Sequence, residues 1–129
     1  MIREILTLED IRLLVDTFYD RIRSDAMLGS IFNTVIGNNW DQHLKKMYRF
    51  WQTILLDEHT YSGSPFPVHL KLALNKEHFE QWVAVFTATV DSLFKGEKAM
   101  EAKWRGERMA AVFNAKIAHH QTENQNFNQ

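Results

Sequence analysis

The fold is decided by the stretch Asn75-Lys-Glu-His-Phe-Glu-Gln-Trp-Val-Ala-Val-Phe86, which continues as Thr-Ala-Thr-Val-Asp-Ser-Leu-Phe to residue 94. Asn75 can cap a helix, because its side-chain oxygen accepts hydrogen bonds from the free N–H groups of the first turn. The large apolar residues that follow recur at intervals of three and four, the spacing of one helix face. They are Phe79, Trp82, Val83, Phe86, Val90 and Phe94. The stretch therefore predicts a long helix that buries an aromatic face.

The same periodicity predicts two helices upstream. The first begins near Thr7, which can cap it, with Asp10 three residues on as an imperfect capping box. Its apolar stripe is Ile11, Leu14, Val15, Phe18 and Ile22, with Tyr19 on the edge. The second begins after Asn38-Asn39 and runs to about Leu56. Its stripe is Trp40, His43, Leu44, Met47, Trp51, Ile54 and Leu55, so a histidine is in register with the buried face.

Shorter segments connect these helices. Gly29 and Gly37 bracket a segment too short for a full helix, which predicts a turn or helical corner. Residues 57–67 form a loop, after which Pro67 can open a short helix over 68–74 that carries His69.

Beyond the break at Gly96, a last helix carries the apolar residues Met109, Val112, Phe113 and Ile117. The polar tail over 121–129 is expected to fray. We find no strand-like alternation, no internal repeat and no second domain. The sequence therefore predicts an all-α fold and a single domain over residues 1–129.

Composition excludes several classes of function. The chain has 129 residues, a formal net charge of -1 and no cysteine. This charge gives no electrostatic case for binding nucleic acid or an anionic membrane. The missing cysteines exclude disulfides and thiolate-bound metal. No phosphate loop, nucleophile elbow or H-E-x-x-H motif supports nucleotide chemistry or hydrolysis.

The chain is also expected to be a soluble cytoplasmic protein. No run approaches the roughly 20 apolar residues that a membrane span needs. The N-terminal residues lack the apolar core of a signal peptide.

Two of the six histidines have apolar neighbours at helical spacing, namely His43 and His69. Either one alone is more often a core-edge histidine bonded to backbone than a metal ligand. As a pair from two helices, they could face each other across a space. A haem pocket is built in this way, with one neutral imidazole on the iron and polar groups on the other side.

Six short elements, in order along the chain, make the comparison specific. They are Phe18-Tyr19, Leu28-Gly-Ser-Ile-Phe-Asn33, Trp40-Asp-Gln-His43, Phe50-Trp51, His69-Leu-Lys-Leu72 and Phe79-Glu-Gln-Trp-Val-Ala-Val-Phe86. With these elements, residues 7 to 118 resemble a group III (P-type) truncated haemoglobin, a globin whose helices pack two over two around one haem. Other groups of that family bend the chain with glycine pairs near the distal helix. Group III lacks those pairs, and so does this sequence.

The resemblance implies roles for particular residues. His69 would be the proximal iron ligand, and His43 would occupy the distal histidine position. Tyr19 would be the distal phenol, while the indole N–H of Trp82 would point at the bound ligand. The haem contacts would come from Phe32, His43, Met47, Trp51, His69, Phe79, Trp82, Val83 and Phe86. Without the family pattern, tryptophans at this spacing are more often plain core than a cofactor wall.

The resemblance also implies a cofactor and small ligands. The cofactor would be haem b with its iron, and the ligands would be dioxygen, carbon monoxide and nitric oxide. The leading interpretation is a binding protein that moderates intracellular oxygen, as a monomer or weak oligomer. The alternative is a haem enzyme that performs nitric oxide dioxygenation or peroxidase-like chemistry with electrons from an unknown reductase. A haem-free helical interaction module is the third interpretation.

Overall fold

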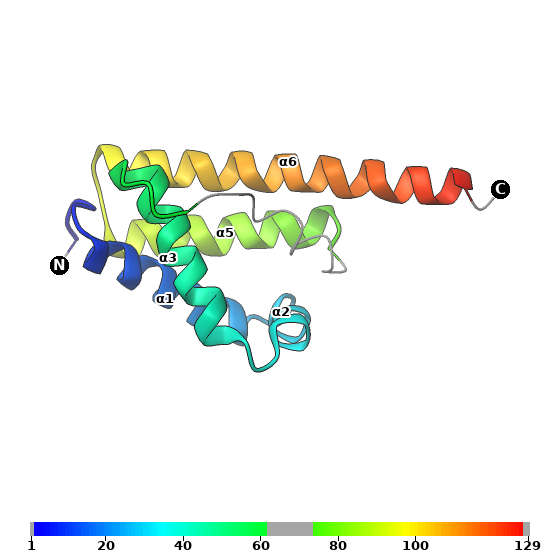
Figure 1. Cartoon of the computed structure of the whole chain (residues 1–129), viewed down its shortest axis with the longest axis horizontal. Helices are drawn as coiled ribbons and strands as arrows, with labels where there is room; N and C mark the ends of the chain where they lie inside the picture. Colours follow the sequence, from blue (N-terminus) through cyan, green and yellow to red (C-terminus); the bar gives the residue numbers. More distant parts are fainter. Residues whose placement is uncertain (1, 62–73, 128–129) are drawn as a thin grey trace.

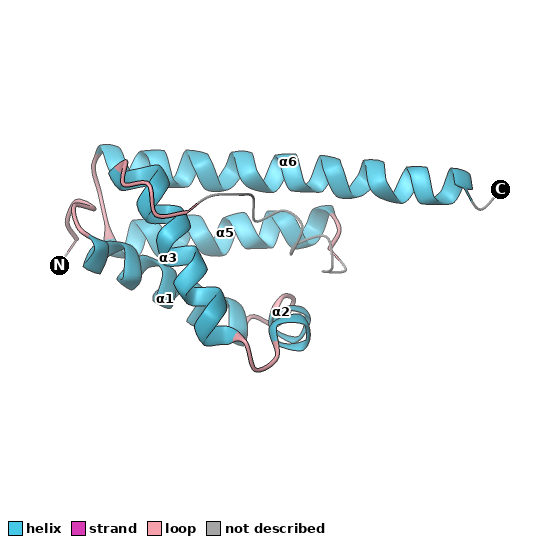
Figure 2. Ribbon diagram, viewed as in Figure 1, coloured by secondary structure: helices cyan, strands magenta, loops and turns pink. Residues whose placement is uncertain are grey.

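A computed structural model describes residues 2–61 and 74–127, with side chains given as far as residue 117 and at His119. Its helices are α1 (Leu8–Ser24), α2 (Gly29–Ile36), α3 (Trp40–Leu56), α5 (Lys76–Leu93) and α6 (Glu97–Phe127). Within the described residues the secondary structure is helix and loop (Figure 2), apart from one isolated bridge between Arg3 and Phe94. The predicted all-α class is confirmed.

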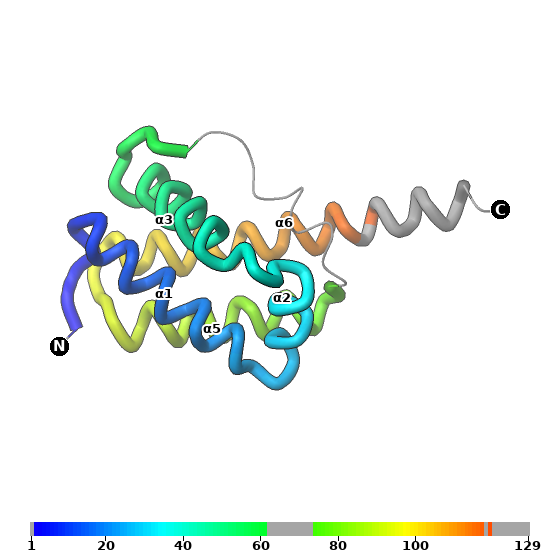
Figure 3. Tube along the Cα trace, turned by 60° about the horizontal axis from the view of Figure 1, so that its bottom comes forward, coloured from blue at the N-terminus to red at the C-terminus, as the bar shows by residue number. Residues whose placement is uncertain are grey.

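The helices pack as two pairs. α5 and α6 run antiparallel side by side, and α1 and α3 pack against each other across them (Figures 1 and 3). α1 also contacts α5, while α3 reaches α6. Residues far apart in sequence therefore meet between the pairs, where aromatic side chains fill the core.

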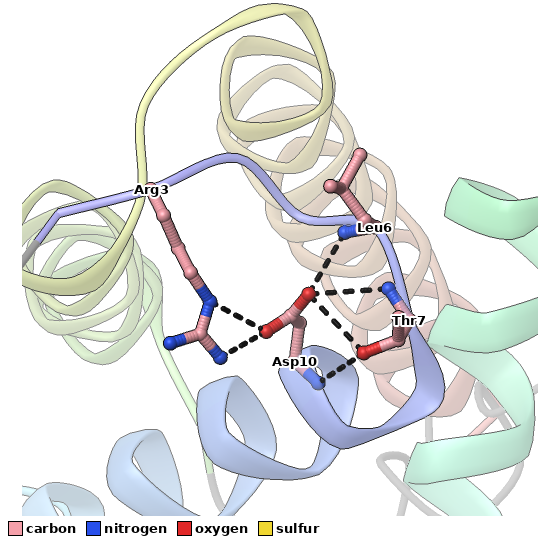
Figure 4. Close-up of polar contacts among 4 residues, drawn as sticks. All are labelled: Arg3, Leu6, Thr7 and Asp10. Atoms are coloured by element: carbon pink, nitrogen blue, oxygen red, sulfur yellow. Dashed lines mark hydrogen bonds and ion pairs between the residues drawn. The ribbon is translucent and has the colours of Figure 1, made fainter.

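Thr7 and Asp10 begin α1 as predicted, and the capping box is complete. The Asp10 N–H donates to Thr7 Oγ1 at 3.4 Å, and the Thr7 N–H donates to Asp10 Oδ2 at 3.1 Å. The same carboxylate also accepts from the Leu6 N–H at 2.9 Å and from the guanidinium of Arg3 (Figure 4). Burial alone would raise the pKa of Asp10, but these hydrogen bonds outweigh it and lower the pKa below 3.8.

The N-terminal segment is also tied to the corner between α5 and α6. The Arg3 N–H donates to the Leu93 carbonyl at 3.4 Å, and the Lys95 N–H donates to the Arg3 carbonyl at 2.9 Å. Gly96 turns the corner with φ +93°, a conformation that disfavours residues with a side chain. The corner therefore connects the start of the chain to its last two helices.

The structure differs from the prediction in three places. Residues 29–36 form a two-turn α-helix instead of a turn or corner. The last helix continues through the polar tail to Phe127, where fraying was expected from residue 121. Val112, grouped with Met109, Phe113 and Ile117 as the apolar residues of the last helix, is 39% exposed, because the other three form the inward face.

Two further predictions concern the short helix that carries His69 and the absence of a membrane span. The short helix over 68–74 and its His69 lie outside the described residues, except for Leu74, which is buried and not helical. Within the part of the chain that is described, no helix is long and apolar enough to cross a bilayer.

Candidate functional site

An apolar pocket lies between α2, α5 and α6. The space between its side chains is about 250 Å³ when the solvent at its open side is included. The described residues that line it are Phe32, Leu74, Phe79, Trp82, Met109, Ala110 and Phe113. Concave sites with a mostly apolar and aromatic lining are typical for flat organic ligands.

Trp82 is held in this pocket by a stack of rings. Its indole lies on Phe86 with ring centroids 5.4 Å apart and planes 10° apart. Phe86 stacks in turn on Trp51 of α3, with centroids 5.1 Å apart and planes at 19°. Phe18 of α1 meets both Trp82 and Phe86 edge-on at 5.2 Å. Three helices therefore fix the orientation of the indole.

The backbone of α6 supports the same stack. A Cβ added at Gly106 would lie 2.7 Å from Phe86 Cδ2, far inside van der Waals contact. Gly106 is buried, and its missing side chain lets α6 approach the Phe86 ring. The position of Phe86, and of Trp82 upon it, thus depends on a glycine of the neighbouring helix.

The Nε1 atom of Trp82 is buried and has no hydrogen-bond partner among the described residues. An indole N–H can only donate. Leaving a buried donor unsatisfied costs roughly 1–3 kcal/mol. This atom is therefore suited to an acceptor that the described residues do not supply.

Tyr19 and His43 lie together on α1 and α3. Tyr19 is only 4% exposed, and its ring meets the His43 imidazole edge-on with centroids 4.9 Å apart. Trp40 contacts both rings at 5.8 Å. Burial raises the pKa of Tyr19 well above its ordinary value of 10.0, so its hydroxyl stays protonated at neutral pH and can donate.

A surface cleft between α1 and α3 reaches Tyr19 from outside. Its walls include Trp40, Leu44 and Tyr48. The guanidinium of Arg23 covers the Trp40 ring at 4.5 Å. Tyr48 donates to Asp16, and burial together with this bond raises the pKa of Tyr48 to about 12.

The residues predicted for the site fall into two sets. Phe32, Phe79 and Trp82 line the apolar pocket. The others surround it or lie on α1 and α3: Tyr19, Met47, Trp51 and Phe86 are buried, and His43 and Val83 are half-buried. The structure brings Trp82, Phe86 and Trp51 into one stack and Tyr19 beside His43. His69 lies outside the described residues.

Sequence reasoning missed four lining residues: Leu74, Met109, Ala110 and Phe113. Met109 and Phe113 were recognised as an apolar face of the last helix, but that face was not assigned to the pocket. It also missed His78, whose Nδ1 accepts from the Asn75 N–H at 3.0 Å and completes the cap of α5.

Comparisons with known proteins identify the fold and the family. The structure matches the crystal structure of a group III truncated hemoglobin from Campylobacter jejuni with a TM-score of 0.82 and 32% identity, covering 91% of this chain and 95% of that one. The group 3 truncated hemoglobin ctb of Campylobacter jejuni is 33% identical over 114 residues, which span 85% of this chain and 90% of that protein. The family model for bacterial-like globins matches residues 4–118.

The chain belongs to the bacterial-like globins, within the group III truncated haemoglobins. As a truncated haemoglobin it is a haem-binding protein that takes small gas ligands such as dioxygen. The residues present fit the cofactor. The pocket offers apolar and aromatic walls to a macrocycle, and Trp82 offers a donor with no partner in the described protein.

Proposed function

We propose that this globin holds haem b with His69 as the iron ligand and binds dioxygen reversibly, moderating its concentration in the cell. Carbon monoxide and nitric oxide would bind at the same position. The observation that carries the proposal is the buried Trp82 Nε1, a donor at an apolar pocket with no acceptor among the described residues.

The pocket residues would hold the macrocycle by contact. Phe32 and Phe79 line the cavity, and Phe86 supports Trp82 from behind. Val83, Met47 and Trp51 complete the apolar surroundings on α5 and α3. The haem iron, when bound, supplies the coordination position for the gas. Close packing of these side chains keeps water out and strengthens each polar contact inside.

Tyr19 and Trp82 would act as the hydrogen-bond donors. The raised pKa of Tyr19 keeps its proton on the hydroxyl, and the indole of Trp82 cannot accept. Because the ring stack fixes Trp82 before a ligand arrives, no reorganisation is needed to form its bond. Two such donors favour slow release of the ligand, which suits a scavenger or buffer better than a carrier.

A second function is favoured by the cleft between α1 and α3. Because Tyr19 is part of the lining of this cleft, a second small molecule in the cleft would lie beside one of the two proposed donors. Oxidation of nitric oxide to nitrate by dioxygen consumes one electron for each nitrate formed. An external reductase would supply that electron.

The first test is the optical spectrum of the purified protein in oxidised, reduced and dioxygen-bound forms. We expect a strong Soret band that shifts between these forms. Trp82→Phe keeps an aromatic side chain but replaces the indole by a smaller ring without an N–H, so we expect dioxygen dissociation to become about tenfold faster, the equivalent of about 1.4 kcal/mol. Trp104→Phe is the matched control, because Trp104 is 51% exposed and does not line the pocket.

Absence of a Soret band after addition of haemin would refute the proposed cofactor. A normal spectrum with unchanged dissociation in Trp82→Phe would leave haem binding intact and remove Trp82 from the ligand site. Nitrate production from nitric oxide in the presence of a reductant would favour the second function.

A further inference from the structure

α6 presents an apolar stripe that no other described helix covers. Met100, Trp104 and Val112 are 67%, 51% and 39% exposed. Together with exposed Arg108 they recur every four residues, so they lie along one face of the helix. Scattered exposed apolar residues are ordinary on protein surfaces, but a line of three on one helix is a feature of interaction surfaces.

The part of this stripe around Trp104 and Arg108 points away from the fold, while Met100 at its N-terminal end also borders a surface cleft with Ile2. Gly106, midway between Trp104 and Arg108, is the point where the α6 backbone meets Phe86 of α5. Residues two positions before and after a buried helical residue lie on the opposite side of the helix. In the view of Figure 1, α5 lies beneath α6 and no described helix lies above it.

The chemistry of the stripe is complementary to itself. Trp104 and Arg108 lie at equal distances on either side of Gly106. An aromatic face attracts a guanidinium, and within the chain Arg105 and Arg108 already approach the Trp104 ring at 5.3 and 5.5 Å. A twofold axis at Gly106 would place Arg108 of each copy against Trp104 of the other.

The charges on α6 favour an antiparallel over a parallel arrangement of the two helices. In an antiparallel arrangement Arg108 of one copy also lies near the acidic Glu101 of the other. Met100 then lies level with Val112, one residue from the small exposed Ala111. A parallel arrangement would instead place Arg108 on Arg108, which is repulsive. Tryptophan, methionine and arginine are the residues enriched at the centre of interfaces.

We propose that the α6 stripe of Met100, Trp104, Arg108 and Val112 is the interface of an antiparallel homodimer, with its twofold axis at Gly106. The partner is a second copy of this chain. The contact is one helix against one helix, so the dimer is weak and forms with rising concentration. The proposal does not depend on the ligand chemistry of the pocket.

The test is sedimentation velocity of the haem-loaded protein from micromolar to millimolar concentration, detected by protein absorbance. We expect a concentration-dependent dimer and a dissociation constant at least tenfold larger for Trp104→Ala. Val35→Ala, at an exposed apolar residue of α2, should behave as the parent protein. A monomer over the whole range, or equal dimerisation of Trp104→Ala and the parent, would overturn the proposal.

Cross-linking tests the antiparallel arrangement. Because the chain has no cysteine of its own, only the introduced cysteines can react. We expect a short bismaleimide to join Met100→Cys protein to Ala111→Cys protein when the two are mixed. Met100→Cys alone should not cross-link, because twelve residues at about 1.5 Å each separate the two sites by about 18 Å. Efficient cross-linking of Met100→Cys to itself would instead show a parallel pairing and contradict the proposed axis.

Discussion

The ring of Tyr19 meets the imidazole of His43 edge-on, with centroids 4.9 Å apart and planes at 85°. This contact joins α1 to α3 and places a phenol and an imidazole on the same side of the core. Because Trp40 touches both rings, the pair is held from the surface as well. The arrangement makes the Tyr19 hydroxyl a fixed group rather than a mobile one.

Tyr19→Phe removes the hydroxyl and keeps the ring contacts. If this hydroxyl donates to the bound gas, dioxygen should dissociate about tenfold faster, since one donor contributes about 1.4 kcal/mol. Stopped-flow displacement of dioxygen by carbon monoxide measures the rate. An unchanged rate would show that the hydroxyl does not contact the ligand.

The same substitution has a second readout at alkaline pH. Burial raises the pKa of Tyr19 in the folded protein, so its contribution to stability is complete below pH 10.0 and is lost as pH rises above that value. Tyr19→Phe should therefore lose less stability above pH 10.0 than the parent protein. Tyr48, with its pKa at about 12, contributes to the slope in both proteins equally. Tyr61→Phe is the control.

His69→Ala should lose stable haem, because we propose His69 as the proximal ligand. Haem retention is measured by gel filtration followed by the ratio of Soret to protein absorbance. His59→Ala, in the exposed loop after α3, should retain haem and serves as the matched control. A parent-like spectrum in His69→Ala would require another ligand.

Asp10→Ala should destabilise the protein at neutral pH by about 1 kcal/mol or more, because the Leu6 and Thr7 N–H groups and the Arg3 guanidinium lose their acceptor. The lowered pKa of Asp10 means that its contribution is present above pH 3.8 and is lost as pH falls through the pKa in the folded state. The difference between variant and parent should therefore shrink in acid. Urea denaturation at several pH values measures it, with Glu9→Ala in the same turn as the exposed control.

Gly106→Ala should destabilise the fold by about 1–3 kcal/mol, as overpacking usually does. The new methyl group would strike Phe86, which is held between Trp51 and Trp82 and cannot easily move aside. Thermal denaturation measures the effect. Adding Phe86→Leu to the variant should recover part of the stability, and failure of this rescue would locate the strain elsewhere.

Helix periodicity predicted most of the fold from the sequence, because the apolar faces of α1, α3 and α5 are wide and well separated. It was less successful where a choice depended on packing. Val112 satisfies the helical spacing but falls outside the arc that α5 covers, and the exposure of one residue in an apolar stripe depends on its neighbours in space. The α2 helix was missed because length alone was taken to exclude it.

In the candidate site, too, some residues could be predicted from the sequence and others depend on packing. Trp82 and Tyr19 were singled out through the family resemblance, and burial around both is consistent with that choice. Leu74 and Ala110 carry no signal of their own, since small or aliphatic residues become pocket walls only when two helices bring them together. The sequence analysis did not single out His78, because a capping bond depends on backbone geometry.

The hydrogen bonds between Arg3 and residues 93 and 95 limit when the protein can complete its fold during synthesis. During synthesis the N-terminal residues leave the ribosome before residues 93–95, so the hydrogen-bond partners of Arg3 become available only after α5 has been made. Until then the backbone of Arg3 has no native hydrogen-bond partner at residues 93 and 95. The globin therefore cannot complete its fold until the corner between α5 and α6 has left the ribosome, because the N-terminal segment bonds to that corner.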